Sequence, residues 1–198
     1  MFFKKESKSS FDMLLVGLGN YGSEYENTRH NVGFMAVDKF CEKHGATLKR
    51  LKCKALICEC RVADKRILCA FPQTYMNLSG DAVSQISQFY KIPKEKILVV
   101  FDDISLDVGN IRIRRNGSHG GHNGMRDIVE RMNTTDILRI KVGVGAKPHP
   151  DYNLADWVLS KFRNDEKENL EKGLEKAVNA IDEIISGTVE RAMNKYNS

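Results

Sequence analysis

The sequence predicts a single α/β domain with a mixed β-sheet flanked by helices. Strand and helix patterns alternate through most of the 198 residues, and neither an internal repeat nor a Pro/Gly/Ser-rich linker marks a domain boundary. The run Ile97–Phe101 is apolar at every position, which is typical of a central strand buried on both faces. Because 41% of the residues are apolar, the chain can bury a substantial core.

The first half of the chain shows a strand, a helix and a hairpin. We predict the first strand at Met13–Leu18, followed by apolar residues at helical spacing. Asn31 is placed to cap that helix, which ends near Gly45. The short β-type runs Ala55–Arg61 and Arg66–Phe71 are separated by a turn that contains an aspartate, so they predict a β-hairpin.

Helices and strands alternate again in the second half. Ser79 is placed to cap a helix that precedes the central strand. Apolar and basic residues alternate at 111–114 and at 138–142, which predicts two strands, and a helical pattern lies between them at 125–132. A last amphipathic helix is predicted over 170–189, with acidic residues at its N-terminal end.

The composition favours a cytoplasmic protein with reduced cysteines. The N-terminal residues include no apolar core of the length a secretory signal needs, and no later stretch approaches the roughly 20 apolar residues of a membrane span. The five cysteines are an odd number without a CxxC pair, so we expect neither a disulfide framework nor a zinc site. Cys58 and Cys60 alternate on one strand face and are interpreted as small buried apolar side chains.

A glycine-rich segment follows the first strand. Residues 17–22, GLGNYG, match the GxGxxG pattern of dinucleotide-binding folds. In those folds a helix begins within the glycines, so that its N-terminus meets the pyrophosphate. Here the helical pattern starts only near Val32, and the acid expected further on, Asp38, falls inside that helix. We therefore expect the glycines to shape a turn that presents Asn20.

His30 is the candidate catalytic base. It is the only side chain in residues 17–37 that titrates near neutral pH, and it stands at a helix entrance. Taken alone, a histidine there is more simply a polar residue that hydrogen-bonds a loop. Asp102 and Asp103 change that balance, because they end the central strand and ligand sites in α/β sheets open at the carboxyl ends of strands. Either acid can orient the imidazole, and spacing does not choose between them.

Three asparagines, Asn20, Asn77 and Asn123, stand at comparable points near helix starts or turns. For any one of them, capping or turn formation is the default role. Asn123 lies in the run SHGGHNG at 118–124, where glycines let backbone amides approach an oxyanion or a phosphate at a helix N-terminus. The two histidines of this run are further candidate bases or polar lining.

Basic residues gather on the two strands around this run and on the helix between them. Side chains two apart on a strand can touch successive phosphates, and such contacts give sequence-independent affinity for nucleic acid. A solvated surface is the alternative interpretation. The net charge of +5 permits a polyanionic partner without requiring one. The residues concerned are Arg112, Arg114, Arg126, Arg131, Arg139 and Lys141.

Four ordered segments together resemble the bacterial-type peptidyl-tRNA hydrolase family. They read GLGNYGSEYENTRHNVGF (17–34), FPQTYMNLSG (71–80), FDDISLDVGNIRIRRNGSHGGHNGMRDI (101–128) and RIKVGVGAKPHP (139–150). The resemblance implies a single α/β domain with a twisted mixed sheet. It also implies an enzyme that hydrolyses the ester joining a peptide to the 3′-terminal ribose of tRNA, and so recycles peptidyl-tRNA released by ribosomes.

The resemblance further implies a set of site residues. The family's essential histidine falls on His30 and its aspartate partner on Asp102. The other positions are the asparagines Asn20, Asn77 and Asn123, the phosphate-contacting Arg114 and Lys141, the pocket residues Tyr25 and His122, and Met76 in the peptide cleft. We expect no cofactor and no metal, and a monomer.

The chain departs from the family pattern at a few places. Tyr21 stands where proline is usual, and Phe71 where lysine commonly precedes Pro72. Lys141 replaces the more usual arginine, which keeps the charge but loses bidentate geometry. These departures put only substrate affinity in doubt. Residues 1–10 lie outside the match, and we expect them to be a flexible extension of a domain at 11–198.

The sequence also favours one mechanism. An ester carbonyl needs an activated nucleophile, and the chain has no nucleophile motif such as GxSxG. Direct attack by water, with His30 as general base, is the simplest hypothesis. The alternative function is a non-catalytic RNA-binding protein on the same scaffold. Peptide preference, tRNA preference and the division of roles among the three asparagines stay open.

Overall fold

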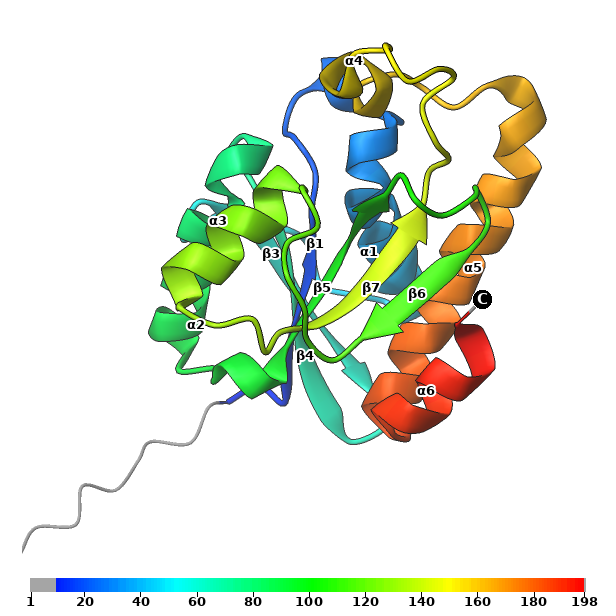
Figure 1. The fold of residues 1–198 in the computed structure, drawn as a ribbon. Coiled ribbons are helices and arrows are strands. Elements are labelled where there is room, and N and C mark those ends of the chain that lie inside the picture. The colour runs from blue at the N-terminus through cyan, green and yellow to red at the C-terminus, as the bar shows by residue number, and fades with distance from the viewer. Residues whose placement is uncertain (1–9, 198) are drawn as a thin grey trace, which may run out of the picture.

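A seven-stranded mixed sheet forms the centre of the molecule, and Figure 1 shows it in the computed structural model, which describes residues 10–197. The strands are β1 Met13–Gly17, β2 Arg50–Lys52, β3 Ala55–Val62, β4 Lys65–Pro72, β5 Ile97–Asp103, β6 Ile111–Arg114 and β7 Leu138–Gly143. Their order is β2-β3-β4-β1-β5-β7-β6. Strands β4, β1, β5 and β7 are parallel, whereas β2, β3 and β6 pair antiparallel with their neighbours.

Helices cover both faces of this twisted sheet (Figure 1). They are α1 Val32–Lys43, α2 Ser79–Tyr90, α3 Asn123–Met132, α4 Leu154–Val158, α5 Lys167–Ser186 and α6 Val189–Tyr196. Helices α1, α5 and α6 pack on one face, and α2 and α3 pack on the other. The predicted single α/β domain with a mixed sheet flanked by helices is confirmed. The extension expected at residues 1–10 lies outside the described residues, apart from Ser10.

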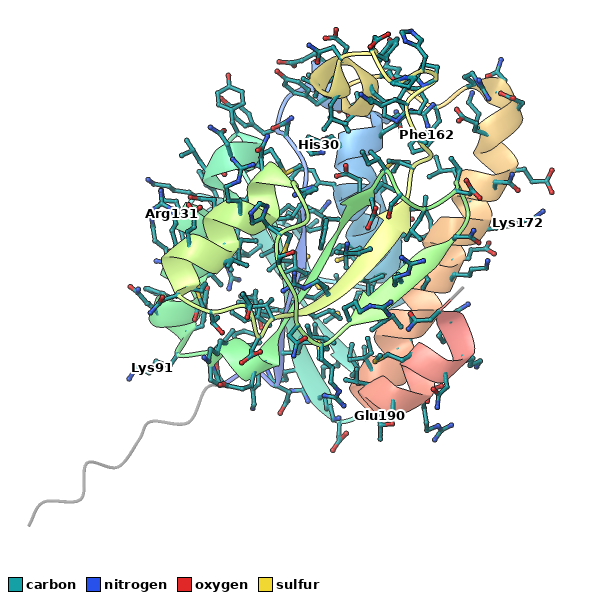
Figure 2. The ribbon with its side chains drawn as sticks, viewed as in Figure 1. His30, Lys91, Arg131, Phe162, Lys172 and Glu190 are labelled. Atoms are coloured by element: carbon teal, nitrogen blue, oxygen red, sulfur yellow. The ribbon has the colours of Figure 1, made fainter. Side chains whose placement is uncertain are left out.

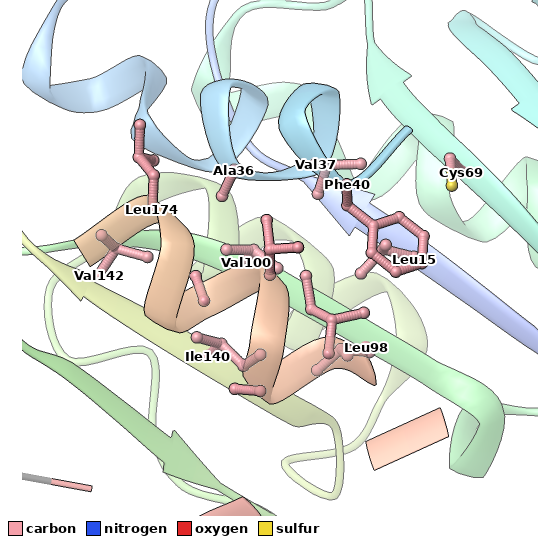
Figure 3. Close-up of a cluster of buried hydrophobic side chains, with 14 of the residues drawn as sticks. Leu15, Ala36, Val37, Phe40, Cys69, Leu98, Val100, Ile140, Val142 and Leu174 are labelled. Atoms are coloured by element: carbon pink, nitrogen blue, oxygen red, sulfur yellow. The ribbon is translucent and has the colours of Figure 1, made fainter. Parts of the chain in front are cut away.

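The larger part of the core lies between the sheet and helices α1 and α5. Figure 3 shows Leu15 and Val100 of the sheet facing Phe40 of α1 and Leu174 of α5. The first three of these side chains are fully buried, and each contributes about 1.5–3 kcal/mol by leaving water. This packing makes β1, β5 and α1 a rigid base for the loops that follow them.

Two glycines allow β1 and α1 to approach closely. A Cβ atom on Gly17 would lie 2.5 Å from the carbonyl oxygen of Gly33, and one on Gly33 would lie 2.3 Å from that of Val100. A hydrogen bond from the Phe34 N–H to the Leu18 carbonyl joins the two elements. The glycines therefore serve packing, and because α1 begins only at Val32, the dinucleotide-binding interpretation is excluded as expected.

Two predicted caps are wrong. Asn31 makes no side-chain bond to α1; its Oδ1 accepts from the Asn20 N–H and its Nδ2 donates to the Asn20 carbonyl, both at 2.9 Å. Ser79 lies within α2 and donates its hydroxyl to the carbonyl of Met76. In both places a preceding 3₁₀ turn leads straight into the helix, so no side-chain cap is formed.

The C-terminal helix expected at 170–189 is two helices. Helix α5 ends at Ser186, and Thr188 caps α6 by accepting a hydrogen bond from the Arg191 N–H. The apolar pattern continues across Gly187 because both helices pack on the same core, which hides the break in periodicity. The short elements β2 and α4 were not predicted either.

Candidate active site

A cleft of about 810 Å³ opens at the carboxyl ends of the parallel strands. Asn20 reaches it from the loop after β1, and Asp102 from the end of β5. The loop before α3 and the short helix α4 form its other walls. This is the position at which the topology of an open α/β sheet leaves a crevice.

His30 and Asp102 form a buried pair in this cleft. The Nδ1 atom of His30 lies 2.8 Å from Oδ1 of Asp102, and the residues are only 8% and 4% exposed. Figure 2 shows His30 beside α1, at the same end of the sheet as Phe162. Asp103 instead pairs with Lys141, whose Nζ lies 2.8 Å from Oδ2. The contact that spacing left open is therefore made by Asp102.

His122 makes a second contact with the same carboxylate. Its Nε2 lies 2.9 Å from Oδ1 of Asp102, and its Nδ1 accepts a hydrogen bond from the Met125 N–H at the start of α3. Because Nδ1 accepts, Nε2 must carry the proton and donate it to Asp102. With Asp102 ionised, Nδ1 of His30 is also a donor, so Nε2 of His30 keeps a free lone pair.

The electrostatics of the pair favour an ionised Asp102. Burial raises the pKa of Asp102, but the two histidines more than reverse that effect and hold this pKa well below its usual range. Burial lowers the pKa of His30, whereas the charge of Asp102 and the hydrogen bond raise it, and the net pKa lies above its ordinary value. The carboxylate thus stabilises a proton that arrives on His30.

Arg29, the neighbour of His30, anchors the turn that carries it. The guanidinium is 1% exposed, lies 3.8 Å from the centre of the Trp157 ring and is 2.7 Å from Oε2 of Glu166. It also donates to the hydroxyl of Ser160. Sequence reasoning missed this residue, because its partners come from elements far along the chain and a basic residue in a loop is ordinarily solvated.

The three asparagines occupy different situations. Oδ1 of Asn20 accepts a hydrogen bond from the Met76 N–H at 2.8 Å, and this bond ties the loop after β1 to the loop before α2. Asn77 and Asn123 line the cleft and are exposed. Within residues 10–197, no side-chain hydrogen bond engages either of them. Their amides are therefore available to a bound molecule.

Some residues of the predicted basic cluster are free to contact a phosphate, whereas Arg139 is buried and holds a loop. Arg112 and Lys141 are cross-strand partners, so Arg114, two residues further, is a diagonal neighbour of Lys141 on the same sheet face. Arg139 is buried and donates to three backbone carbonyls, among them that of Ser118 before α3. The prediction that Arg139 lies on the surface is thus wrong, because its buried side chain holds the loop that precedes α3.

The cleft also contains residues that were not expected, and two expected residues lie outside its lining. Tyr25 is half-buried in a 3₁₀ turn, and Arg114 lies at the end of β6. Helix α4 contributes an apolar wall that the sequence analysis missed. The available signal was Asn153, which caps α4 by accepting from two backbone N–H groups. His119 lines the cleft, as the sequence allowed, and the unexpected lining side chains are Tyr75, Phe101, Ile104, Leu154, Ala155, Val158 and Leu159.

One group in the cleft has the composition of a metal site. The ligand atoms of His30, Asp102 and His122 all lie within 4.8 Å of one another. However, each ring nitrogen that faces Asp102 carries a proton in the hydrogen-bonded arrangement, and a metal ion would have to displace both. The donor set is satisfied by its own hydrogen bonds.

The fold and this site define a hydrolytic enzyme of the α/β class, built around an imidazole that a carboxylate orients. The family model described as peptidyl-tRNA hydrolase matches residues 14–198, and the chain belongs to this family. It is 48% identical over 184 residues to the peptidyl-tRNA hydrolase of Clostridium botulinum strain Alaska E43, covering 93% of this chain and 95% of the relative. The crystal structure of peptidyl-tRNA hydrolase from Acinetobacter baumannii superposes with a TM-score of 0.88 at 35% identity, covering 96% of this chain and 98% of that one.

Proposed function

We propose that the chain hydrolyses the ester bond between a peptide and the 3′-terminal ribose of tRNA by direct attack of water, with His30 as the general base. The buried His30–Asp102 pair beside the cleft carries this proposal. An imidazole whose Nε2 is unprotonated takes a proton from water, and the adjacent carboxylate stabilises the imidazolium that results. His122 positions Asp102 through its own hydrogen bond.

The lining of the cleft supports water as the nucleophile. Among the described residues, no serine, threonine or cysteine lines it. A covalent acyl-enzyme on one of these side chains would need such a residue within hydrogen-bond reach of His30. Activation of a water molecule by His30 requires only the arrangement described above.

The exposed amides of Asn77 and Asn123 suit the remaining chemistry. A carboxamide both donates and accepts hydrogen bonds without carrying charge, as recognition of a peptide main chain requires. Asn123 stands beside His122 at the first residue of α3, so we assign it to the attacking water or the oxyanion. Asn77 is assigned to the peptide, beside Met76. Asn20 positions Met76 and borders the same cleft.

The basic residues at the edge of β6 and β7 are assigned to the tRNA phosphates. Arg114 is exposed, and Lys141 lines the cleft next to it on the same sheet face. The ion pair with Asp103 holds Lys141 in place and offsets part of its charge, so Arg114 supplies the larger electrostatic contribution. Tyr25 stays a candidate contact at the periphery.

We further propose that the protein acts as a monomer in the cytoplasm, where it recycles tRNA. The five cysteines are all free, as a reducing compartment favours. None of the helices within residues 10–197 is long and apolar enough to cross a membrane. The size of the protein in solution, measured by light scattering, tests the monomer.

One experiment separates catalysis from the alternative of a non-catalytic RNA-binding protein. The protein is incubated with an N-acylated aminoacyl-tRNA in the presence of EDTA, and release of the acyl amino acid is followed. Release in the presence of EDTA selects the hydrolase. Binding without release would select the RNA-binding alternative and reject the proposed mechanism.

A further inference from the structure

Four of the five cysteines gather in the core, at the end of α1 opposite to His30. Cys41 comes from α1, Cys58 and Cys60 come from β3, and Cys69 comes from β4. All four thiols are free, and their residues are between 0% and 7% exposed. Figure 3 shows Cys69 on the sheet face that packs against α1. The hydrolytic mechanism uses none of them.

The thiols are close enough to share one ligand. The Sγ atoms of Cys41, Cys58 and Cys69 all lie within 4.8 Å of one another, and those of Cys41 and Cys58 are 3.5 Å apart. Cys58 and Cys69 are direct partners in the antiparallel pair of β3 and β4. Two sulfurs bound to one tetrahedral Zn²⁺ at about 2.3 Å lie roughly 3.8 Å apart. The three sulfurs therefore need only small shifts to coordinate a single ion.

A fourth thiol is within reach of this group. Cys60 lies two residues after Cys58, so both side chains point to the same sheet face. Cys60 is not among the three sulfurs that lie within 4.8 Å of one another, so its side chain must turn toward them to complete a tetrahedral set. Three ligands come from a paired β-hairpin and one from a packed helix, which are elements rigid enough to hold a coordination geometry.

We propose that Cys41, Cys58 and Cys69, with Cys60 as the fourth ligand, bind one thiophilic metal ion of the Zn²⁺ type. Each coordinating thiol releases its proton to solvent as the metal–sulfur bond forms, so affinity rises with pH. The bound ion fastens the last turns of α1 to the β3/β4 hairpin. Sequence spacing does not reveal this site, because its ligands come from three elements and include no CxxC pair.

The chemistry of the ligands narrows the choice of metal. Four thiolates around one divalent cation carry a net charge of −2. Soft thiolate ligands select Zn²⁺ or Cu⁺ over harder cations.

Metal content tests the proposal. The chain is produced in zinc-supplemented medium, purified with a reductant, and analysed beside Cys58→Ala, Cys69→Ala and the control Cys53→Ala. Cys53 is half-buried and outside the group, so its removal should not matter. We expect about one zinc per chain in the wild type and in Cys53→Ala, and roughly tenfold less in the other two. Ester hydrolysis at the wild-type rate shows that the variants fold.

Reconstitution with Co²⁺ identifies the ligands. A sulfur-to-cobalt charge-transfer band is expected in the wild type and in Cys53→Ala and should be absent in Cys58→Ala. Repeating the titration in a His30→Ala background breaks up the His30–Asp102–His122 group, so a band that persists there belongs to the thiols. Equal metal content in all variants would overturn the proposal. The proposal would also be overturned if the wild type contained no metal while a thiol assay after unfolding found all five cysteines reduced. Only three reactive thiols without reductant would show a disulfide instead, and would also overturn it.

Discussion

His30 Nδ1 lies 2.8 Å from Asp102 Oδ1, although 72 positions separate the two residues in the chain. Parallel pairing of β1 with β5 brings their carboxyl ends together, so the turn after β1 and the last residues of β5 border one cleft. Close packing at Gly33 sets where α1 begins, and with it the place of His30. The pair is therefore a product of sheet topology, and its function can be tested at each residue.

Removal of the proposed general base should abolish most turnover and leave binding intact. We expect His30→Ala to lower kcat by roughly 10²–10⁴-fold, the usual contribution of a general base. The affinity for tRNA, measured by filter binding, should stay nearly unchanged because His30 is buried and carries no phosphate contact in the proposal. His149→Ala is the control, since His149 is exposed and outside the lining of the cleft. Hydrolysis at the wild-type rate by His30→Ala would reject its role.

The pH profile should report the Asp102 carboxylate. Activity requires neutral His30, so kcat/KM falls as the pH drops through the raised pKa of His30. Asp102→Asn removes the charge that raises this pKa and leaves the burial that lowers it, so the acid limb should move to lower pH. The maximal rate should also fall, because the asparagine amide favours the wrong tautomer. The control Asp103→Asn removes the ion pair with Lys141 and should leave the acid limb of the profile in place. If the acid limb of Asp102→Asn also stayed in place, Asp102 would not be the partner of His30.

His122→Ala should shift the same limb in the opposite direction. Without the hydrogen bond from His122, the negative charge of Asp102 is less compensated, so it stabilises protonated His30 more strongly. The pKa of His30 should therefore rise, and the acid limb of the pH profile should move to higher pH. The Met125 N–H also loses its cap, which costs about 1 kcal/mol in the free energy of unfolding. His119→Ala is matched, because His119 lines the cleft without contacting Asp102. If His122→Ala lost stability without a shift in the acid limb of the pH profile, the role of His122 would be limited to capping α3.

Phosphate contacts should appear in the salt dependence of substrate binding. Arg114→Ala is expected to weaken tRNA binding and to reduce the slope of log affinity against log salt by about 1. Lys172→Ala on α5 is the control; its ammonium pairs with Glu168 one helical turn away, and Figure 2 shows it on the outer surface of the molecule. Equal slopes in wild type and Arg114→Ala would exclude Arg114 from the phosphate contacts.

Periodicity predicted most of the fold because the elements are regular and strongly patterned. Ile97–Phe101 is apolar throughout and lies in the interior strand β5, and the alternation at 111–114 marks β6. The break between α5 and α6 at Gly187 was not predicted, because both helices pack their apolar faces on the same core. Helix α4 is only five residues long, too short for a helical period to emerge.

The cleft was less predictable than the fold because its residues meet only in three dimensions. Spacing offered Asp102 and Asp103 equally, and the choice depends on side-chain direction at the end of β5, where Asp103 turns to Lys141. Arg139 carries the same charge as its neighbours, yet its burial follows from the fold of the loop that it holds. A charge pattern shows neither which side chains are buried nor which partners neutralise them.

Arg29 should hold His30 in place through its buried contacts, and stability and catalysis should both fall when it is removed. Arg29→Ala leaves Glu166 without its buried partner and removes the stacking on Trp157, so the free energy of unfolding should fall by about 3 kcal/mol in urea denaturation. Burial raises the pKa of Glu166, but the hydrogen bonds and charges of Arg29 and Arg163 together lower it by more, so the net pKa is below its ordinary value. The ion pair therefore stabilises the protein above the pKa that Glu166 has when unfolded, and this contribution is lost as the pH falls through its lowered folded pKa. The stability difference between wild type and Arg29→Ala should narrow under those acidic conditions, whereas Lys172→Ala, in an exposed pair with Glu168, should change stability by less than about 1 kcal/mol at any pH. A pH-independent difference would show that the aromatic contacts, and not the ion pair, hold the turn.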